Sequence, residues 1–102
     1  MNLNDLQMNT VYTFKLNSGE EVIGKVLKVS DNVVEISDPV SIAPSPKGMG
    51  LVPSVFTANA KENVRLNTNS VSLVAKTADE IVDKYREATT GITVPEKKIL
   101  AG

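Results

Sequence analysis

The residues of this chain that could do chemistry are carboxylates, lysines and side-chain amides, because the sequence contains neither cysteine nor histidine. That absence excludes disulfide bonds, thiolate metal sites and the Ser-His and Cys-His pairs of nucleophilic catalysis. Acid–base catalysis would need two carboxylates in one pocket, and the adjacent Glu20 and Glu21 point to opposite faces of an extended strand. We therefore expect a binding protein that is not an enzyme and uses no cofactor or metal ion.

The side chains that remain suited to hydrogen-bonding a ligand share a position in predicted turns and loops: Asp31, Asn32, Lys47, Asn67, Thr68 and Asn69. Asp and Asn are favoured in turns because their short side chains bond nearby backbone groups and tolerate the left-handed conformation. Taken singly, each is therefore interpreted as a turn former. Lys47, beside Gly48 in a proline-rich loop, is expected at a solvated loop tip, with a contact to phosphate as the alternative.

Length and composition limit the elements that could position these residues. The chain has 102 residues, enough for one domain, and 41% hydrophobic residues, typical of a globular protein. Its formal net charge of -1 argues against coating duplex DNA, which needs a basic surface. Binding of a few unpaired nucleotides in a local pocket stays open.

Alternating apolar and polar residues predict a series of short strands. These cover residues 10–17, 21–29, 33–37 with a continuation over 40–43, 51–58, 64–66 and 71–75. Asp38-Pro39 should interrupt the third strand, residues 44–48 should form a loop, and residues 2–9 a short helix or turn. Gly19 is expected to adopt a positive φ in a tight turn, and Gly24 to mark a bend or a close approach within its strand.

The hydrophobic period changes after the last strand. Thr77 and Glu80 have the spacing of a capping box, and Ile81, Val82 and Tyr85 follow at helical spacing. We therefore predict a helix over 78–89 within a segment 77–90, closed by Gly91. Residues 91–102 are expected to form a partly ordered tail, and the whole chain, 1–102, a single domain.

The stretch from Leu16 to Asp38, LNSGEEVIGKVLKVSDNVVEISD, resembles the first Sm motif of the Sm/LSm family. Gly19 and Gly24 occupy its two glycine positions, and Ser30-Asp31-Asn32 stands at its acidic turn. The resemblance covers about residues 11–76. It implies a mainly β fold, a strongly bent five-stranded open barrel of the Sm-like or SH3-like type, followed here by a C-terminal α-helix.

The second Sm motif matches less closely. Asn69 fits the family pattern before the final strand, whereas Asn67 and Thr68 replace its Arg-Gly pair. Val34 stands where an asparagine usually closes the uridine pocket, and Asn32 stands where a base often stacks. The helix follows the barrel instead of preceding it, an order similar to that of small Sm-like proteins carried by tailed phages.

The resemblance implies a homo-oligomeric ring of five to seven subunits that binds single-stranded RNA or DNA near its pore. Asn32, Asn67 and Asn69 would contact bases, while Lys47 and backbone amides would contact phosphates. No apolar run approaches the ~20 residues of a membrane span and residues 1–9 lack a signal-peptide pattern. We therefore expect a cytoplasmic protein, in the host cytoplasm if phage-encoded.

Two alternatives remain open at this point. Any small barrel of the SH3 or OB type can place a glycine at a strand bend, so Gly24 alone does not select the Sm fold. The near-neutral charge and the aromatic content of 4% also favour a structural or assembly module that binds protein and no nucleic acid.

Overall fold

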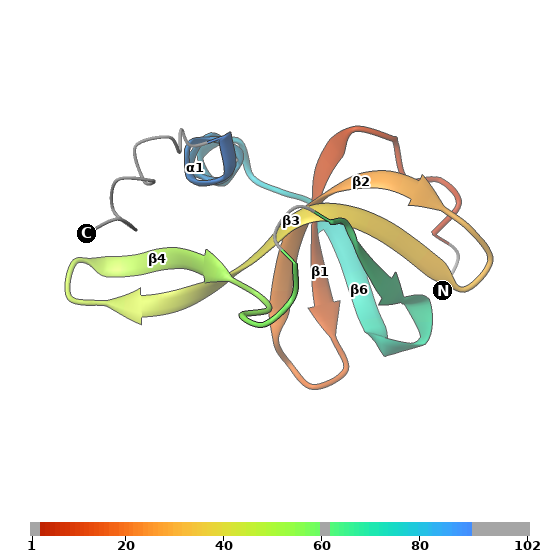
Figure 1. Cartoon of the computed structure of the whole chain (residues 1–102), viewed down its shortest axis with the longest axis horizontal. Helices are drawn as coiled ribbons and strands as arrows, with labels where there is room; N and C mark the ends of the chain where they lie inside the picture. The colour runs from red at the N-terminus through yellow and green to blue at the C-terminus, as the bar shows by residue number, and fades with distance from the viewer. Residues whose placement is uncertain (1–2, 60–61, 91–102) are drawn as a thin grey trace.

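The computed structural model describes residues 3–59 and 62–90, and most of them belong to one antiparallel sheet with a helix after it (Figure 1). The elements in chain order are β1 (Thr10–Leu16), β2 (Glu21–Val29), β3 (Val33–Ser45), β4 (Gly48–Pro53), β5 (Val64–Asn67), the short 3-10 helix η1 (Thr68–Ser70), β6 (Val71–Lys76) and α1 (Asp79–Thr90). The prediction of a mainly β fold with a C-terminal helix is confirmed.

The six strands pair in the order β4-β3-β2-β1-β6, and β5 pairs with β3. The sheet is not closed in the part of the chain that the structure describes. β4 and β6 end the main path and β5 pairs with β3 alone, so each of these three strands has an unpaired edge. Six strands form where the resemblance implied five. The division of β3 is the reason, since its first half pairs with β5 and its second half with β4.

The bend in β3 occurs at Asp38, which has a φ of 48°. Ile23 pairs with Val40 whereas Lys25 pairs with Ser37, so β3 has one extra residue here relative to β2. The predicted interruption is therefore a β-bulge inside a continuous strand, a common way to redirect a strand. Beyond the bulge, residues 40–53 form a hairpin, here called the arm, which projects from the rest of the sheet (Figure 1).

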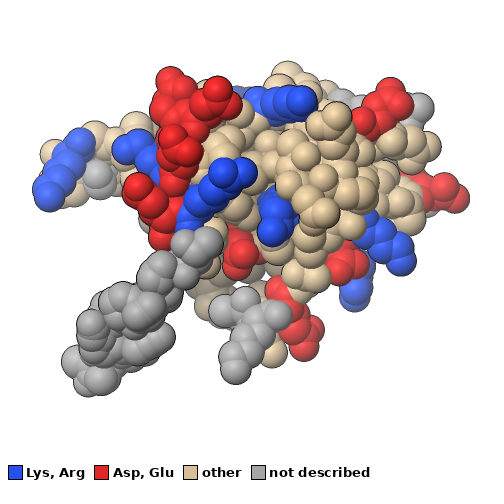
Figure 2. Space-filling view, turned by 90° about the horizontal axis from the view of Figure 1, so that it is seen from above, with Lys and Arg blue, Asp and Glu red and all other residues tan. Residues whose placement is uncertain are grey.

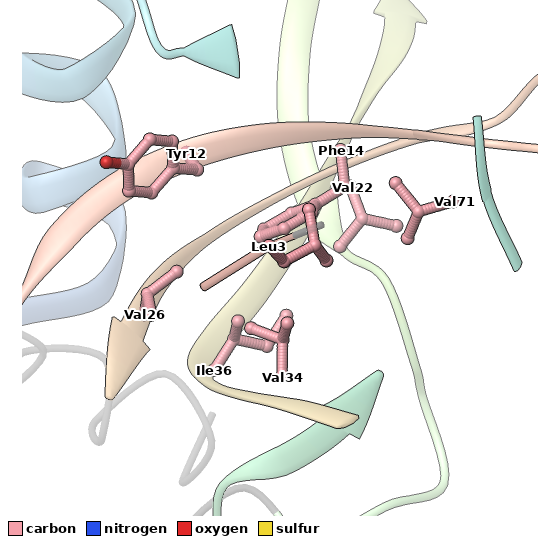
Figure 3. Packing of buried hydrophobic residues seen from close by; sticks show 8 residues of the cluster. All are labelled: Leu3, Tyr12, Phe14, Val22, Val26, Val34, Ile36 and Val71. Carbon is pink, nitrogen blue, oxygen red and sulfur yellow. The ribbon is translucent and has the colours of Figure 1, made fainter. Parts of the chain in front are cut away.

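Both faces of the sheet are buried, each by a different hydrophobic cluster. Side chains alternate along β1, so Tyr12 and Phe14 face one cluster and Val11 the other. The larger cluster lies on one side of the sheet (Figure 3) and has eight buried members: Leu3, Tyr12, Phe14, Val22, Val26, Val34, Ile36 and Val71. The smaller one unites Val11, Ile23, Val40 and Tyr85, so α1 covers the second face.

Gly24 makes the close approach that its place in the strand predicted. A Cβ atom on Gly24 would lie 2.9 Å from Cδ1 and 3.1 Å from Cβ of Ile36, whose side chain is completely buried. Gly19 has a φ of 96°, as expected for its turn. Glycine is therefore required at position 24 by a steric contact and favoured at position 19 by its backbone conformation.

Several predicted boundaries were wrong. The predicted loop over 44–48 is a hairpin with a two-residue turn at Pro46-Lys47, because β3 and β4 pair as far as Ser45 and Gly48. The fourth strand ends at Pro53, not at residue 58. Of the helix or turn expected over residues 2–9, the structure has the turn: residues 3–9 contain turns.

The helix begins at Asp79 and follows a different arrangement from the predicted capping box. The Thr77 hydroxyl lies 2.8 Å from the Thr13 hydroxyl, and the Ala78 carbonyl accepts from the amides of Ile81 and Val82. Gly91 and the tail over 91–102 lie outside the described residues. Within residues 3–59 and 62–90, no helix has the length and apolarity required to cross a bilayer.

Candidate functional site

The two polar turns singled out in the sequence lie side by side. Val33 pairs with Asn67 across β3 and β5, and the Thr68 amide donates a 3.0 Å hydrogen bond to the Asn32 carbonyl. Antiparallel pairing of β3 with β5 thus joins the β2–β3 turn to η1. We call the residues brought together here the turn cluster: Asp31, Asn32, Asn67, Thr68 and Asn69.

One amide of the turn cluster is already used by the fold. The Asn67 Oδ1 accepts a 2.9 Å hydrogen bond from the Asn69 amide and caps η1. Asn17, the residue after β1, supports the same turn: its side-chain Nδ2 donates to the Asn69 carbonyl and its backbone amide to the Ser70 carbonyl, both at 2.8 Å. The interpretation as a turn former therefore holds for Asn67.

Sequence analysis missed Asn17. Its side-chain Oδ1 also accepts a 2.8 Å hydrogen bond from Ser72. These partners lie 52 and 55 residues away along the chain, and no local pattern signals such distant contacts. Asn17 is therefore a supporting residue of the turn cluster that only the fold reveals.

The other two asparagines of the turn cluster are available to a ligand. Asn32 and Asn69 are exposed, and within the described residues their side-chain amides have no hydrogen-bond partner. Each amide offers a donor and an acceptor, the pattern needed to read the edge of a base. Thr68 is half-buried, and Asp31 is exposed and is the one charged member of the turn cluster.

Lys47 is not part of this site. It lies in the turn at the tip of the arm, whereas the turn cluster lies at the first residues of β3, which has 13 residues (Figure 1). At a rise of about 3.3 Å per residue, the two ends of such a strand are tens of ångströms apart along its path. Within one chain, Lys47 therefore lies apart from the turn cluster.

The surface charge is mixed. Lys and Arg side chains are interspersed with Asp and Glu on the face seen in Figure 2 and do not form a continuous basic surface there. An ion pair joins Lys15 to Glu21 at 3.7 Å, and the amide of Asn63 donates to Glu35 at 2.9 Å. No group of three or more acidic residues among residues 3–59 and 62–90 is arranged to hold a metal ion.

A groove of about 380 Å³ lies on another part of the molecule, between the base of the arm and the last turn of α1. Its walls are mostly apolar and include Pro39, Pro53, Val55, Phe56 and Ala88. Phe56 is 80% exposed, an unusual state for a phenylalanine. Because residues 51–58 were predicted to form a strand, no functional role was predicted for Phe56.

A smaller cavity of about 270 Å³ adjoins this groove, and Tyr85 and Lys25 form part of its wall. The Tyr85 hydroxyl donates to the Ser37 carbonyl at 2.7 Å and accepts from the Lys25 amide at 3.2 Å. It therefore bridges β2 and β3 where the bulge disrupts their ladder. Burial, and to a smaller extent the negative charge of Asp38, raises the pKa of Tyr85 above its usual range.

Comparison with known proteins does not assign the chain to a family. No family model matches it, and no curated protein gives a significant match.

Proposed function

We propose that this chain is an Sm-like protein that assembles into a homo-oligomeric ring and binds single-stranded nucleic acid, preferably RNA, through the turn cluster. One observation carries the proposal, the hydrogen bond from the Thr68 amide to the Asn32 carbonyl. It joins the two turns that correspond to the two motifs of the resemblance. Both turns must meet if they are to form one binding surface.

Asn32 and Asn69 supply the chemistry of recognition. Their exposed amides can pair with the Watson–Crick edge of an unstacked base, the usual target of sequence-specific RNA binding. With Asp31 as its one charged member, the turn cluster attracts phosphates weakly. Affinity should therefore depend little on salt and should gain from repetition of the site around a ring.

Self-association is supported by the edges of the sheet. Among the described residues, β4, β5 and β6 each have an unpaired edge, and an unpaired edge presents backbone donors and acceptors to another chain. Pairing of β4 in one copy with β6 in the next would use two different surfaces. Such a head-to-tail contact closes into a ring when the rotation between copies allows it.

Fluorescence-anisotropy titration with short oligo-U, oligo-A and single-stranded DNA tests the binding. Replacing Asn32 or Asn69 with alanine should weaken RNA binding at least tenfold, a loss of about 1.4 kcal/mol. Asn63→Ala is the control, because Asn63 is an exposed asparagine that lies just before β5, away from the turn cluster, and bonds Glu35 there. Absence of binding at tens of micromolar protein refutes the proposal.

A second function is a structural or assembly module that binds protein and no nucleic acid. It is favoured by the net charge of -1 and by the absence of any cation from the turn cluster. Light scattering with absorbance at two wavelengths separates the two functions. Under this alternative the purified assembly contains a protein partner and no nucleic acid, and Asn32→Ala leaves its composition unchanged.

A further inference from the structure

The arm has an apolar face that is only partly covered. Ile42 pairs with Leu51 and Pro44 pairs with Met49, and residues in such pairs project from the same face of a hairpin. Near the base, Leu51 packs against the cluster beneath α1. Near the tip, Met49 is 66% exposed. A two-stranded hairpin is only marginally stable without cover, so this end of the arm needs a partner.

The groove at the base of the arm has matching properties. Phe56 and Val55 are exposed on its wall, at 80% and 43%. The charged residues that line it, Asp38 and Glu62, are both acidic. Within residues 40–53, Lys47 at the tip is the one charged residue. The tip of the arm and the groove are therefore complementary in both apolar character and charge.

The tip cannot fill the groove of its own molecule. Val40 and Pro53, which line the groove, form the first pair of the hairpin, and Ser45 and Gly48 form the last. Five residue steps at about 3.3 Å each separate these pairs by roughly 17 Å along the hairpin. An occupant with the chemistry of the tip must therefore come from another molecule.

We propose that the arm of one copy of this chain docks its tip into the groove of a second copy, with Met49 against Phe56 and Lys47 beside Asp38 and Glu62. The tip and the groove are different surfaces, so the contact is head-to-tail and continues from copy to copy until it closes. The inference rests on the self-association proposed above. It is independent of nucleic-acid binding and assigns Lys47 to the interface between subunits.

Cysteine cross-linking tests the contact, since the native chain has no cysteine. Two full-length variants, Met49→Cys and Phe56→Cys, are mixed, allowed to exchange subunits and oxidised mildly. A disulfide needs Cβ atoms about 3.5–4.5 Å apart, so the mixed Met49–Phe56 product should form at least tenfold faster than either homodimer. Ser18→Cys, in the exposed turn between β1 and β2, replaces Phe56→Cys in the control mixture and should give little product.

Two results of this experiment overturn the inference. If Met49→Cys links mainly to itself, the arms contact each other and the groove is not the receptor. If the mixed product forms no faster than the Ser18 control, the tip does not reach the groove. Circular dichroism of each variant verifies that the fold is intact.

A charge exchange gives an independent measurement. Lys47→Glu or Glu62→Lys alone should raise the concentration at which the assembly dissociates at least fivefold, measured as absolute mass by light scattering. The double variant should restore it, and the control Lys28→Glu, on the exposed side of β2, should have no effect. If the ring forms and its dissociation concentration is unchanged by all these substitutions, this inference is refuted while the proposed ring is retained. A monomer at every concentration overturns both.

Discussion

The contact between Gly24 and Ile36 allows the packing of the sheet to be tested with one added methyl group. In Gly24→Ala, the new Cβ would meet Cδ1 of Ile36 at 2.9 Å and its Cβ at 3.1 Å. Real Cβ atoms do not tolerate the shorter distance. Ile36 is completely buried on the neighbouring strand, so it cannot turn toward solvent. Strands β2 and β3 must therefore separate, or Ile36 must leave its rotamer.

Overpacking of this kind costs about 1–3 kcal/mol. Unfolding in urea, followed by circular dichroism at fixed protein concentration, should show that loss of stability for Gly24→Ala. Ile36→Val alone should cost about 0.5–1.5 kcal/mol, because it deletes the buried Cδ1. The double variant removes the 2.9 Å contact, so its loss should be smaller than the sum of the two single losses by about 1 kcal/mol.

Gly19 supplies the matched control. Nothing lies within 4 Å of a Cβ built there, and its φ of 96° makes Gly19→Ala unfavourable through the backbone alone. The loss of stability in Gly19→Ala should therefore be additive with that in Ile36→Val. Strict additivity of Gly24→Ala and Ile36→Val would refute the proposed steric contact.

Three further outcomes are expected. Tyr85→Phe should lower the free energy of unfolding by about 1–3 kcal/mol in thermal or urea melts, because it leaves the Ser37 carbonyl and Lys25 amide unpaired at the bulge; an unchanged melt would show that water replaces the hydroxyl. The pKa of Tyr85 is raised by folding, so its protonated hydroxyl contributes stability below the unfolded-state pKa near 10, and this stability is lost as the pH rises through the folded-state pKa. The native protein should therefore lose more stability in alkali than Tyr85→Phe does. Equal losses would contradict this role. Asn67→Ala should lower the free energy of unfolding by roughly 1 kcal/mol because η1 loses its cap, whereas Asn69→Ala should leave it unchanged. The reverse order in urea melts would contradict the assignment of Asn67 as structural and Asn69 as ligand-facing.

The strands and the helix could be predicted from local pattern. Alternation located β1, β2 and β6 to within one residue, because each has an apolar face whose period survives in the structure. The arm could not be predicted in this way. Pro44 and Pro46 indicate a loop by composition, yet only Pro46 lies in the turn, because pairing with Met49 retains Pro44 within β3.

The candidate site, too, could be predicted from the sequence only in part. Residue type alone identified Asp31, Asn32, Asn67, Thr68 and Asn69 as turn residues, and their pairing across β3 and β5 placed them together. Residue type also suggested Lys47, but its position depends on the course of a strand that bends at a bulge. No property of a single segment encodes that course.

What the sequence by itself determined was an inventory of residue types and turns: no cysteine or histidine, glycines at Gly19 and Gly24, and polar turns able to bind by hydrogen bonds. These depend on residue type and on nearest neighbours along the chain. Tertiary structure alone decided which turns meet, which asparagine is used by the fold, and that Phe56 remains exposed on the wall of a mostly apolar groove. The physical reason is that burial and cross-strand contact are properties of segments far apart in sequence, and a local pattern carries no information about its distant partner.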